Sequence, residues 1–378
     1  MEIIVGSKHL ATQVFTAHDV TGREHLVIIA KATWQIPAAG QRPRPLPPEP
    51  IAVADSYFGE PGLSPMRYGS DCVRFKLRCD ILLDAIAYPP QYQPQTEWRA
   101  GFRVGNLQKA LRVLGPRQWQ KRFGSYAISD PAATASVPLH YGYAFGGSHE
   151  YTVQQDGQAI SYTEALLSNP VGMGWRGSQS GAELSGQPAP QLESIHAAIQ
   201  APDDNLAPMA LSAIGRHWLP RTQYTGTYDE RWQQEVFPFL PEDFDERFNQ
   251  CAPMDQQTDY LLGGEEIVLL NLHPSQPDIR FKLPPLDGIT PKVLRNDYSS
   301  EMPACHADTL YIEPEQNRFS IVWRASTPIR RRLQEFKTIA IGPVNPQWWK
   351  EQTLGMEGGC SGCGSSPLVI ADITDEDE

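Results

Sequence analysis

Two cysteines near the end of the chain have a spacing that carries metal or redox chemistry in other proteins. Cys360-Ser-Gly-Cys363 supplies half of a zinc site, but the sequence has no second C-x-x-C and no H-x3-5-H to complete four ligands. Thioredoxin-type chemistry needs the pair at a helix N-terminus, whereas this pair lies in a Gly/Ser-rich stretch. We therefore predict no metal site and no cofactor, and Cys360 and Cys363 are the remaining metal candidates.

Three glycines, Gly172, Gly174 and Gly177, match the G-x-G-x-x-G spacing of a dinucleotide-binding loop. That fingerprint must follow a strand and open a helix, but here Asn169-Pro170 precedes it and a Ser/Gly-rich segment follows. We interpret the segment as a glycine-rich loop. The chain also lacks the G-x-x-x-x-G-K-[ST] phosphate loop and the G-x-S-x-G nucleophile elbow.

The densest local pattern is LPEDFDERFNQ, residues 240–250. A helix here would pair Asp243 with Arg247 at i, i+4 and place Phe244 and Phe248 on one apolar face. One interpretation is a short structural helix docked by its two phenylalanines. The other is a recognition element, and its candidate partner-binding residues are Asp243, Phe244, Asp245 and Arg247.

Composition limits the class of protein. The net charge is −12, which argues against a nucleic-acid binder. The 34 prolines exclude a coiled coil or a bundle of long helices, because interior proline breaks a helix. We see no signal peptide and no apolar stretch long enough to span a membrane, and the six sparse cysteines suit a reducing compartment. We expect a soluble cytoplasmic protein with no membrane partner.

Apolar and β-branched residues alternate in several short segments, which predicts strands. Strands or hairpins are expected at 12–36, 73–81, 96–104, 108–114, 265–272, 279–283, 309–325 and 336–341, and short helical pieces at 162–167 and 193–200. The predicted fold is mainly β, with two packed, sandwich-like antiparallel halves, short helices and long Pro/Gly-rich loops. We place an N-terminal β-rich half at 1–147, a loop-rich connection at 148–205, a C-terminal β-rich half at 206–345 and a flexible Gly/Ser/Cys and acidic tail at 346–378.

Eight segments that occur in a fixed order resemble a known family. They are KATWQI (31–36), DCVRFKLRCDILLDAIAYPP (71–90), LRVLGPRQW (111–119), VPLHYGYAFGG (137–147), NPVGMGW (169–175), RHWLPR (216–221), TGTYDERW (225–232) and LPEDFDERFNQCAPMDQ (240–256). Together they resemble a bacterial domain-of-unknown-function family whose members act as adaptors in type VI secretion.

This resemblance implies a cytoplasmic accessory protein that is not an enzyme. Such an adaptor would bind a cognate secreted effector, or its PAAR-like region, and help to load it onto the secretion spike. The nine Trp, fourteen Tyr and thirteen Phe residues suit protein binding and equally suit a β core. A carbohydrate-active β-sandwich enzyme or sugar-binding protein, with paired carboxylates and aromatic platforms, is the alternative.

Overall fold

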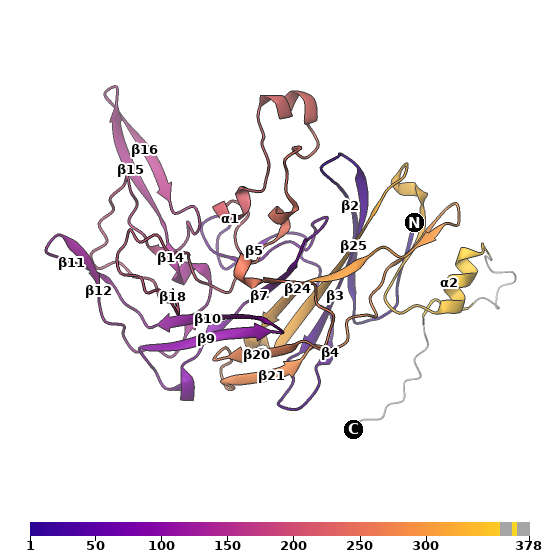
Figure 1. The fold of residues 1–378 in the computed structure, drawn as a ribbon, viewed down its shortest axis with the longest axis horizontal. Coiled ribbons are helices and arrows are strands. Elements are labelled where there is room, and N and C mark those ends of the chain that lie inside the picture. Colours follow the sequence, from indigo (N-terminus) through magenta and orange to yellow (C-terminus); the bar gives the residue numbers. More distant parts are fainter. Residues whose placement is uncertain (356–364, 369–378) are drawn as a thin grey trace.

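Two large β-sheets pack face to face at the centre of the molecule (Figure 1). The computed structural model describes residues 1–355 and 365–368. The prediction of a mainly β, antiparallel fold with few short helices is confirmed.

The larger sheet has seven strands in the order β19-β7-β24-β25-β3-β2, with β4 paired to β3. Its pairs are antiparallel except for β7 with β24. The strand bounds are β2 Ala11–His18, β3 Glu24–Gln35, β4 Arg44–Leu46, β7 Cys79–Leu83, β19 Gln257–Thr258, β24 Cys305–Glu313 and β25 Arg318–Pro328.

The second sheet has five antiparallel strands in the order β18-β10-β9-β20-β21. Its strands are β9 Glu97–Val104, β10 Leu107–Leu114, β18 Leu192–Ser194, β20 Glu266–Leu270 and β21 Asp278–Lys282. Both large sheets therefore combine strands from the ranges 1–147 and 206–345.

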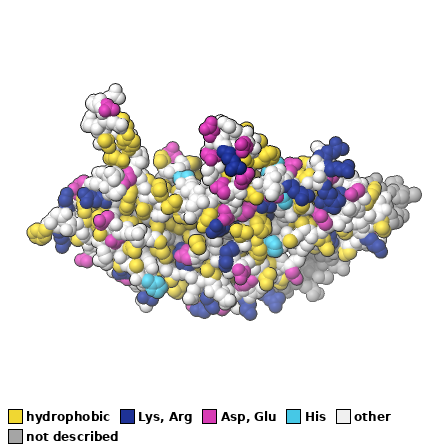
Figure 2. Space-filling model, turned by 45° about the horizontal axis from the view of Figure 1, so that its top comes forward, with side chains coloured by type: hydrophobic (Ala, Val, Ile, Leu, Met, Phe, Trp, Pro, Cys, Tyr) yellow, Lys and Arg dark blue, Asp and Glu magenta, His cyan; other side chains and the backbone are white. Residues whose placement is uncertain are grey.

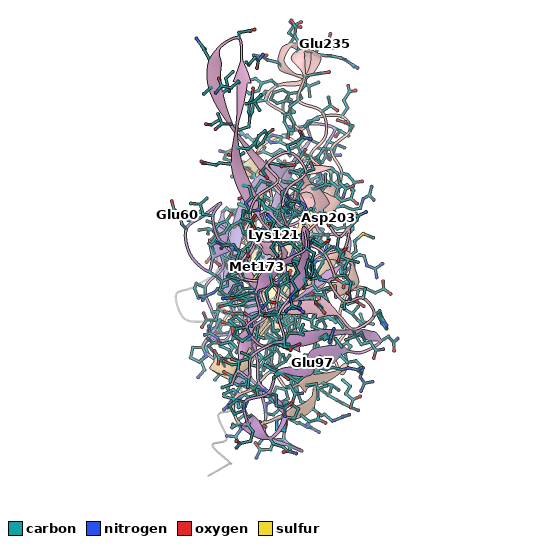
Figure 3. All side chains as sticks on the ribbon, turned by 90° about the vertical axis from the view of Figure 1, so that its left-hand side faces the viewer. Glu60, Glu97, Lys121, Met173, Asp203 and Glu235 are labelled. Carbon is teal, nitrogen blue, oxygen red and sulfur yellow. The ribbon has the colours of Figure 1, made fainter. Side chains whose placement is uncertain are left out.

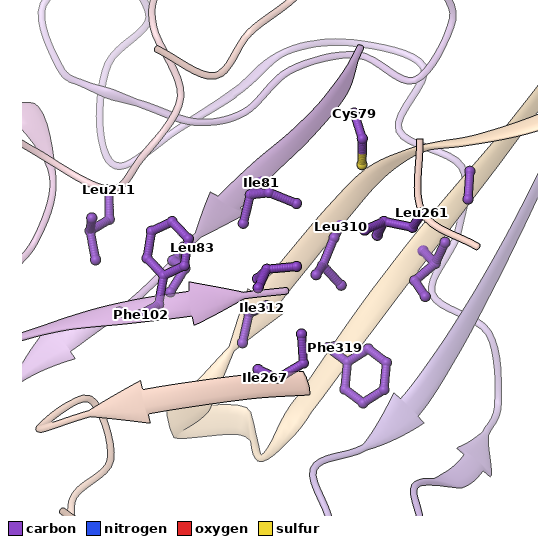
Figure 4. Packing of buried hydrophobic residues seen from close by; sticks show 14 of the residues in the cluster. Cys79, Ile81, Leu83, Phe102, Leu211, Leu261, Ile267, Leu310, Ile312 and Phe319 are labelled. Atoms are coloured by element: carbon purple, nitrogen blue, oxygen red, sulfur yellow. The ribbon is translucent and has the colours of Figure 1, made fainter. Parts of the chain in front are cut away.

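The main core fills the space between these two sheets. Alternate residues of each strand point inward, as the pleat requires, so Ile81 and Ile312 of the larger sheet meet Phe102 and Ile267 of the smaller one (Figure 4). These four side chains are at most 4% exposed. Burying each of them contributes about 1.5–3 kcal/mol of transfer free energy.

The opposite face of the seven-stranded sheet is charged as well as apolar. Lys31, Asp80 and Arg324 come from three of its strands and are each at most 5% exposed. Two irregular segments, 47–78 and 246–256, lie across this face, and the charged side chains bond to them.

Each of the three charges has several partners. Lys31 Nζ donates to Asp71 Oδ2 and to Pro50 O, both at 3.2 Å. Arg324 forms an ion pair with Asp308 at 2.7 Å and donates to Val73 O at 2.8 Å.

Asp80 is the centre of the third set of bonds. Its Oδ2 accepts from Lys76 Nζ at 2.8 Å and from Cys251 N at 2.9 Å, and its Oδ1 accepts from Gln250 Nε2 at 2.7 Å. Burial alone would lower the pKa of Lys76, but the charge of Asp80 keeps that pKa above its ordinary value. Lys76 also donates to Thr309 Oγ1 at 2.8 Å, so the cluster is saturated.

A smaller sheet of four strands lies beside the sandwich, in the order β1-β26-β22-β23. Its strands are β1 Glu2–Val5, β22 Lys292–Arg295, β23 Ser300–Glu301 and β26 Phe336–Ile341. Helix α2, Pro346–Thr353, packs Trp348 against Ala340 and Val344. The composition of residues 346–378 did not reveal this helix.

The remaining elements are short. They are β5 Ser56–Tyr57, β6 Met66–Tyr68, β8 Ile86–Ala87, β11 Trp119–Arg122, β12 Ser125–Ile128, β13 Val137–Pro138, β14 Phe145–Gly146, β15 Ser148–Gln155, β16 Gln158–Ala165, β17 Met173–Gly174 and α1 Leu219–Thr222, with 3-10 turns at Pro90–Tyr92, Tyr141–Tyr143, Glu246–Asn249, Met254–Gln256, Pro314–Gln316 and Leu333–Glu335 and a π-helical turn at Trp232–Val236.

Most predicted strands lie where the alternation placed them, including 96–104, 108–114 and 336–341. The strand predicted at 73–81 is wrong before Cys79, because Lys76 does not face water but is buried against Asp80. The helical pieces predicted at 162–167 and 193–200 are also wrong, since these segments contribute to β16 and β18.

We expect Asp80→Ala to lower the free energy of unfolding by about 3–5 kcal/mol, because it leaves the buried ammonium of Lys76 without its partner. Urea denaturation followed by tryptophan fluorescence measures this loss. Asp259→Ala is the control, because Asp259 pairs with Arg78 while its side chain is 97% exposed, and its midpoint should equal that of the wild type. Equal midpoints for both variants would contradict the structural role of the cluster.

Candidate functional site

Two projections rise from the same side of the molecule (Figures 1 and 3). The first, which we call the arm, is the hairpin of β15 and β16, residues 148–165. The second, which we call the finger, is residues 224–245 and contains the π-helical turn Trp232–Val236. Neither projection belongs to the two large sheets.

The arm has an apolar face with no core behind it. Its register pairs Tyr151 with Tyr162 and Val153 with Ile160, so all four side chains lie on one face. The two tyrosine rings stack at 5.7 Å between centroids. Tyr162 and Val153 are each 41% exposed. A two-stranded hairpin alone is only marginally stable in water, so a surface that covers this face would stabilise the arm.

The base of the arm is fixed by hydrogen bonds. Glu164 accepts bonds from the side chain of Ser178 and from the backbone N–H groups of residues 178–180. These bonds lower the pKa of Glu164 to about 2. On the facing strand, His149 Nε2 donates to Trp175 O at 2.6 Å.

The finger carries exposed aromatic side chains at its tip. Tyr228 and Phe237 are 54% and 65% exposed and both contact the ring of Trp232. Trp232 Nε1 donates to Phe239 O at 3.0 Å, and Phe239 packs against His18 at the end of β2. The finger is therefore ordered by its own side chains while its outer rings face solvent.

Buried polar groups clamp the base of the finger to the sandwich. Arg221 is 3% exposed and donates to Phe248 O at 2.8 Å and to Ile214 O at 3.0 Å. Asn249 Nδ2 donates to Phe75 O at 2.9 Å, and Glu246 pairs with Arg74. Segments 47–78 and 246–256, which are bonded to the charged face of the sheet, thus also position the finger.

A hollow of about 720 Å3 lies at the base of the arm, and none of its described lining residues belongs to the finger. Its lining includes Ser148 and His149 of the arm, and also Leu63 and His217. Leu219, which begins α1 and leads into the finger, donates its N–H to Leu167 O at 2.8 Å just after the arm. The bases of the arm and the finger are therefore joined directly.

The surface around the hollow is apolar and open to solvent. Leu63, Leu167 and Leu219 are 74%, 60% and 49% exposed, and we call these three residues the saddle. Hydrophobic side chains are visible along the arm and between the arm and the finger, while acidic side chains gather on the finger (Figure 2).

His140 supports the loop that presents Leu63. Its ring lies 4.3 Å from the ring of Phe58, between centroids, and its Nδ1 accepts from Gly142 N. Burial, together with the positive charge of Arg67, lowers the pKa of His140 to about 4. The imidazole is therefore neutral at pH 7.

The structure places the predicted partner-binding residues at the base of the finger. Residues 240–250 form a turn and a 3-10 helix, Glu246–Asn249, in place of the predicted α-helix. Arg247 pairs with Asp245 at 2.5 Å, whereas the predicted partner Asp243 accepts from Thr227 N and Oγ1.

Phe244 and Phe248 do contact each other, with ring centroids 5.9 Å apart, although both are only half-buried. Whether Asp243, Phe244, Asp245 and Arg247 bind a partner stays a prediction. Cys360 and Cys363 lie outside the described residues.

The G-x-G-x-x-G segment contributes to the wall of the hollow and is a loop apart from the two-residue strand β17, Met173–Gly174. Gly172 and Gly174 belong to its wall, and a Cβ on Gly172 would lie 2.3 Å from Asn169 Nδ2. Gly174 has a φ of +90°, which side-chain-bearing residues rarely adopt. These glycines are required by close packing of the loop against its neighbours.

The arm was not predicted, although the sequence carries a signal for it. Asp156-Gly157 joins two alternating segments and adopts positive φ at both positions, the pattern of a tight hairpin turn. The weak periodicity and frequent Gly, Ser, Gln and Pro residues of 148–205 suggested a loop-rich connection instead.

A model of a family described as an uncharacterized protein conserved in bacteria (DUF2169) matches residues 21–324. The chain belongs to the DUF2169 family. This DUF2169 protein has no match among curated proteins and none among solved structures. The matched range includes the arm, the hollow and the finger.

Two further observations concern the part of the chain that the structure describes. In residues 1–355 and 365–368, no helix has the length and apolar character needed to cross a membrane. Within the same ranges, no group of three His, Cys, Asp or Glu side chains is close enough to hold a metal ion.

We expect the stability of this DUF2169 protein to fall between pH 7 and pH 5 partly through His140. Its pKa is lower in the folded state than the ordinary value of about 6.5, so its contribution is complete above pH 6.5 and is lost as the pH falls toward 4. This histidine should account for about 2 kcal/mol of the change between pH 7 and pH 5.

His140→Gln should remove that part of the pH dependence, measured by urea denaturation at both pH values. His196→Gln is the control, because His196 is exposed. An unchanged pH dependence in His140→Gln would contradict the buried, neutral state of this ring.

We expect Asp243→Ala to loosen the finger without lowering the melting temperature, because Asp243 bonds only to Thr227 among the described contacts and lies outside the core. The finger has one basic residue, Arg231, so native-state trypsin cleavage after Arg231 reports its opening. The cleavage rate should rise severalfold. Gln233→Ala, an exposed change elsewhere in the finger, should be cleaved at the wild-type rate. Equal cleavage rates for both variants would refute the role of the bonds between Asp243 and Thr227 in holding the finger closed.

Proposed function

We propose that this protein is a type VI secretion adaptor that binds a cognate secreted effector, or its PAAR-like region, and helps to load it onto the secretion spike. The observation that carries the proposal is the pair of projections, which flank an apolar, solvent-exposed saddle. An adaptor needs a rigid body that presents a surface to one partner, and the sandwich with its clamped projections supplies that arrangement.

The exposed side chains are of the type that anchors protein interfaces. Tyr162, Tyr228 and Phe237 are each more than 40% exposed, and aromatic residues are enriched among interface hot spots. Leu63 and Leu167 add exposed apolar side chains near the hollow, and Tyr228 and Phe237 add exposed rings on the finger; exposed apolar surface of this kind marks an interaction site.

The hollow supports this proposal better than the carbohydrate-active alternative. A glycosidase of the usual kind needs two facing carboxyl groups. Among the described residues that line the hollow, Glu183 is the single carboxylate. It is already bonded to Lys121 Nζ and Tyr126 OH, both at 2.6 Å. Protein binding requires no such pair.

We expect the protein to co-purify with the effector encoded by the neighbouring gene when the two are co-expressed. Tyr162→Ser combined with Val153→Ser should reduce the recovered effector about tenfold, because it removes two exposed anchors from the arm. The melting temperature should not change, since neither residue belongs to the core.

The matched control is Thr152→Ala combined with Gln154→Ala, two residues of β15 on the opposite face of the same hairpin. This variant should recover the effector as the wild type does. Failure of the wild-type protein to form any complex with the effector would refute the adaptor function. Equal loss in both double variants would refute the role of the apolar face.

A further inference from the structure

Both the arm and the finger are acidic, and the finger is the more so. Residues 148–165 contain Glu150, Asp156 and Glu164 and no Lys or Arg, a net charge of 0 − 3 = −3. Residues 224–245 contain six Asp and Glu residues and one Arg, a net charge of 1 − 6 = −5. That single cation, Arg231, is paired with Glu235 at 3.2 Å and lies 3.6 Å from Glu242.

We infer that the partner segment bound between the arm and the finger is a protein segment with an apolar centre flanked by Lys or Arg residues. This inference rests on the proposed adaptor function and states the chemistry of its partner. The apolar centre would cover the saddle and the unpartnered face of Tyr151, Val153, Ile160 and Tyr162. The flanking cations would face the acidic finger.

Three features of the surface select this partner chemistry. The saddle leucines and the arm face have no cover among the described residues, and burying them favours an apolar segment. Each finger carboxylate that the partner cations would meet is exposed, so it can be approached at little desolvation cost. An acidic or phosphate-bearing partner, such as a nucleic acid or an anionic membrane, would be repelled by the finger.

The finger geometry agrees with this selection. Glu230 and Glu235 lie on the exposed turn beside the aromatic tip, and Figure 3 shows Glu235 at the end of the projection. Tyr228 and Phe237 flank the same turn and stay exposed. Exposed aromatic rings and negative charges therefore lie together on the finger, which would set the register of a partner segment that carries apolar and positively charged side chains.

Two fluorescein-labelled peptides test this inference without the effector. Both have the apolar centre Leu-Val-Ile-Leu-Val, and they differ only in three flanking lysines or three flanking glutamates on each side. Fluorescence anisotropy with the full chain should give a Kd for the lysine-flanked peptide that is at least about tenfold lower. Absence of a preference, or of binding to either peptide, would overturn the inference.

A matched pair of variants separates the finger from the overall negative charge. Glu230→Lys with Glu235→Lys should remove the preference. Asp278→Lys with Asp287→Lys changes the net charge equally, on β21 and the loop after it, on the other side of the molecule from the finger, and should keep the preference (Figure 1). Equal losses in both variants would show that only net charge matters and would overturn the inference.

The outcomes are independent of the adaptor function itself. Co-purification with the effector together with no peptide preference would refute the partner chemistry and leave the adaptor function standing. A peptide preference that depends on the finger, without any complex with the effector, would refute the adaptor function and leave the surface chemistry standing.

Discussion

Charged side chains on one face of the seven-stranded sheet hold two long segments that add no strand to that sheet. Lys31, Asp80 and Arg324 each bond to backbone or side-chain groups of segments 47–78 and 246–256. A buried charge is costly unless all its bonds are made, so the segments can cross the sheet in only one arrangement. These bonds fix the backbone conformation of two segments that have little regular secondary structure of their own.

The molecule thus consists of a rigid body, in which the bonded segments are fixed to the sheets, and two projections, the arm and the finger. The body is stabilised by the apolar space between the large sheets and by the charged face beneath the irregular segments. The bases of the arm and the finger are joined by the hydrogen bond from Leu219 N to Leu167 O. Both projections bury little of their own surface. Folding of the body therefore does not depend on the exposed surfaces of the arm and the finger.

The fold class and most strands could be predicted, because period-two alternation reports directly which face of a strand is buried. The prediction failed before Cys79, because the alternation placed Arg74 and Lys76 on a solvent-exposed face, whereas Lys76 is buried and paired with Asp80. The dense pattern at 240–250 overlaps only the end of the finger, and its Asp243 bonds to Thr227, 16 residues away, which helical spacing does not describe. The arm was missed because its apolar face is short and has no core partner.

Hydrogen–deuterium exchange of the full chain, alone and in the complex with the co-expressed effector, tests most directly whether the partner occupies the space between the arm and the finger. The account predicts new protection in residues 148–165 and 224–245, with little change in β9 and β10, whose amides are already bonded within the five-stranded sheet. Protection confined to the outer face of that sheet, with the arm and the finger exchanging as in the free protein, would contradict it.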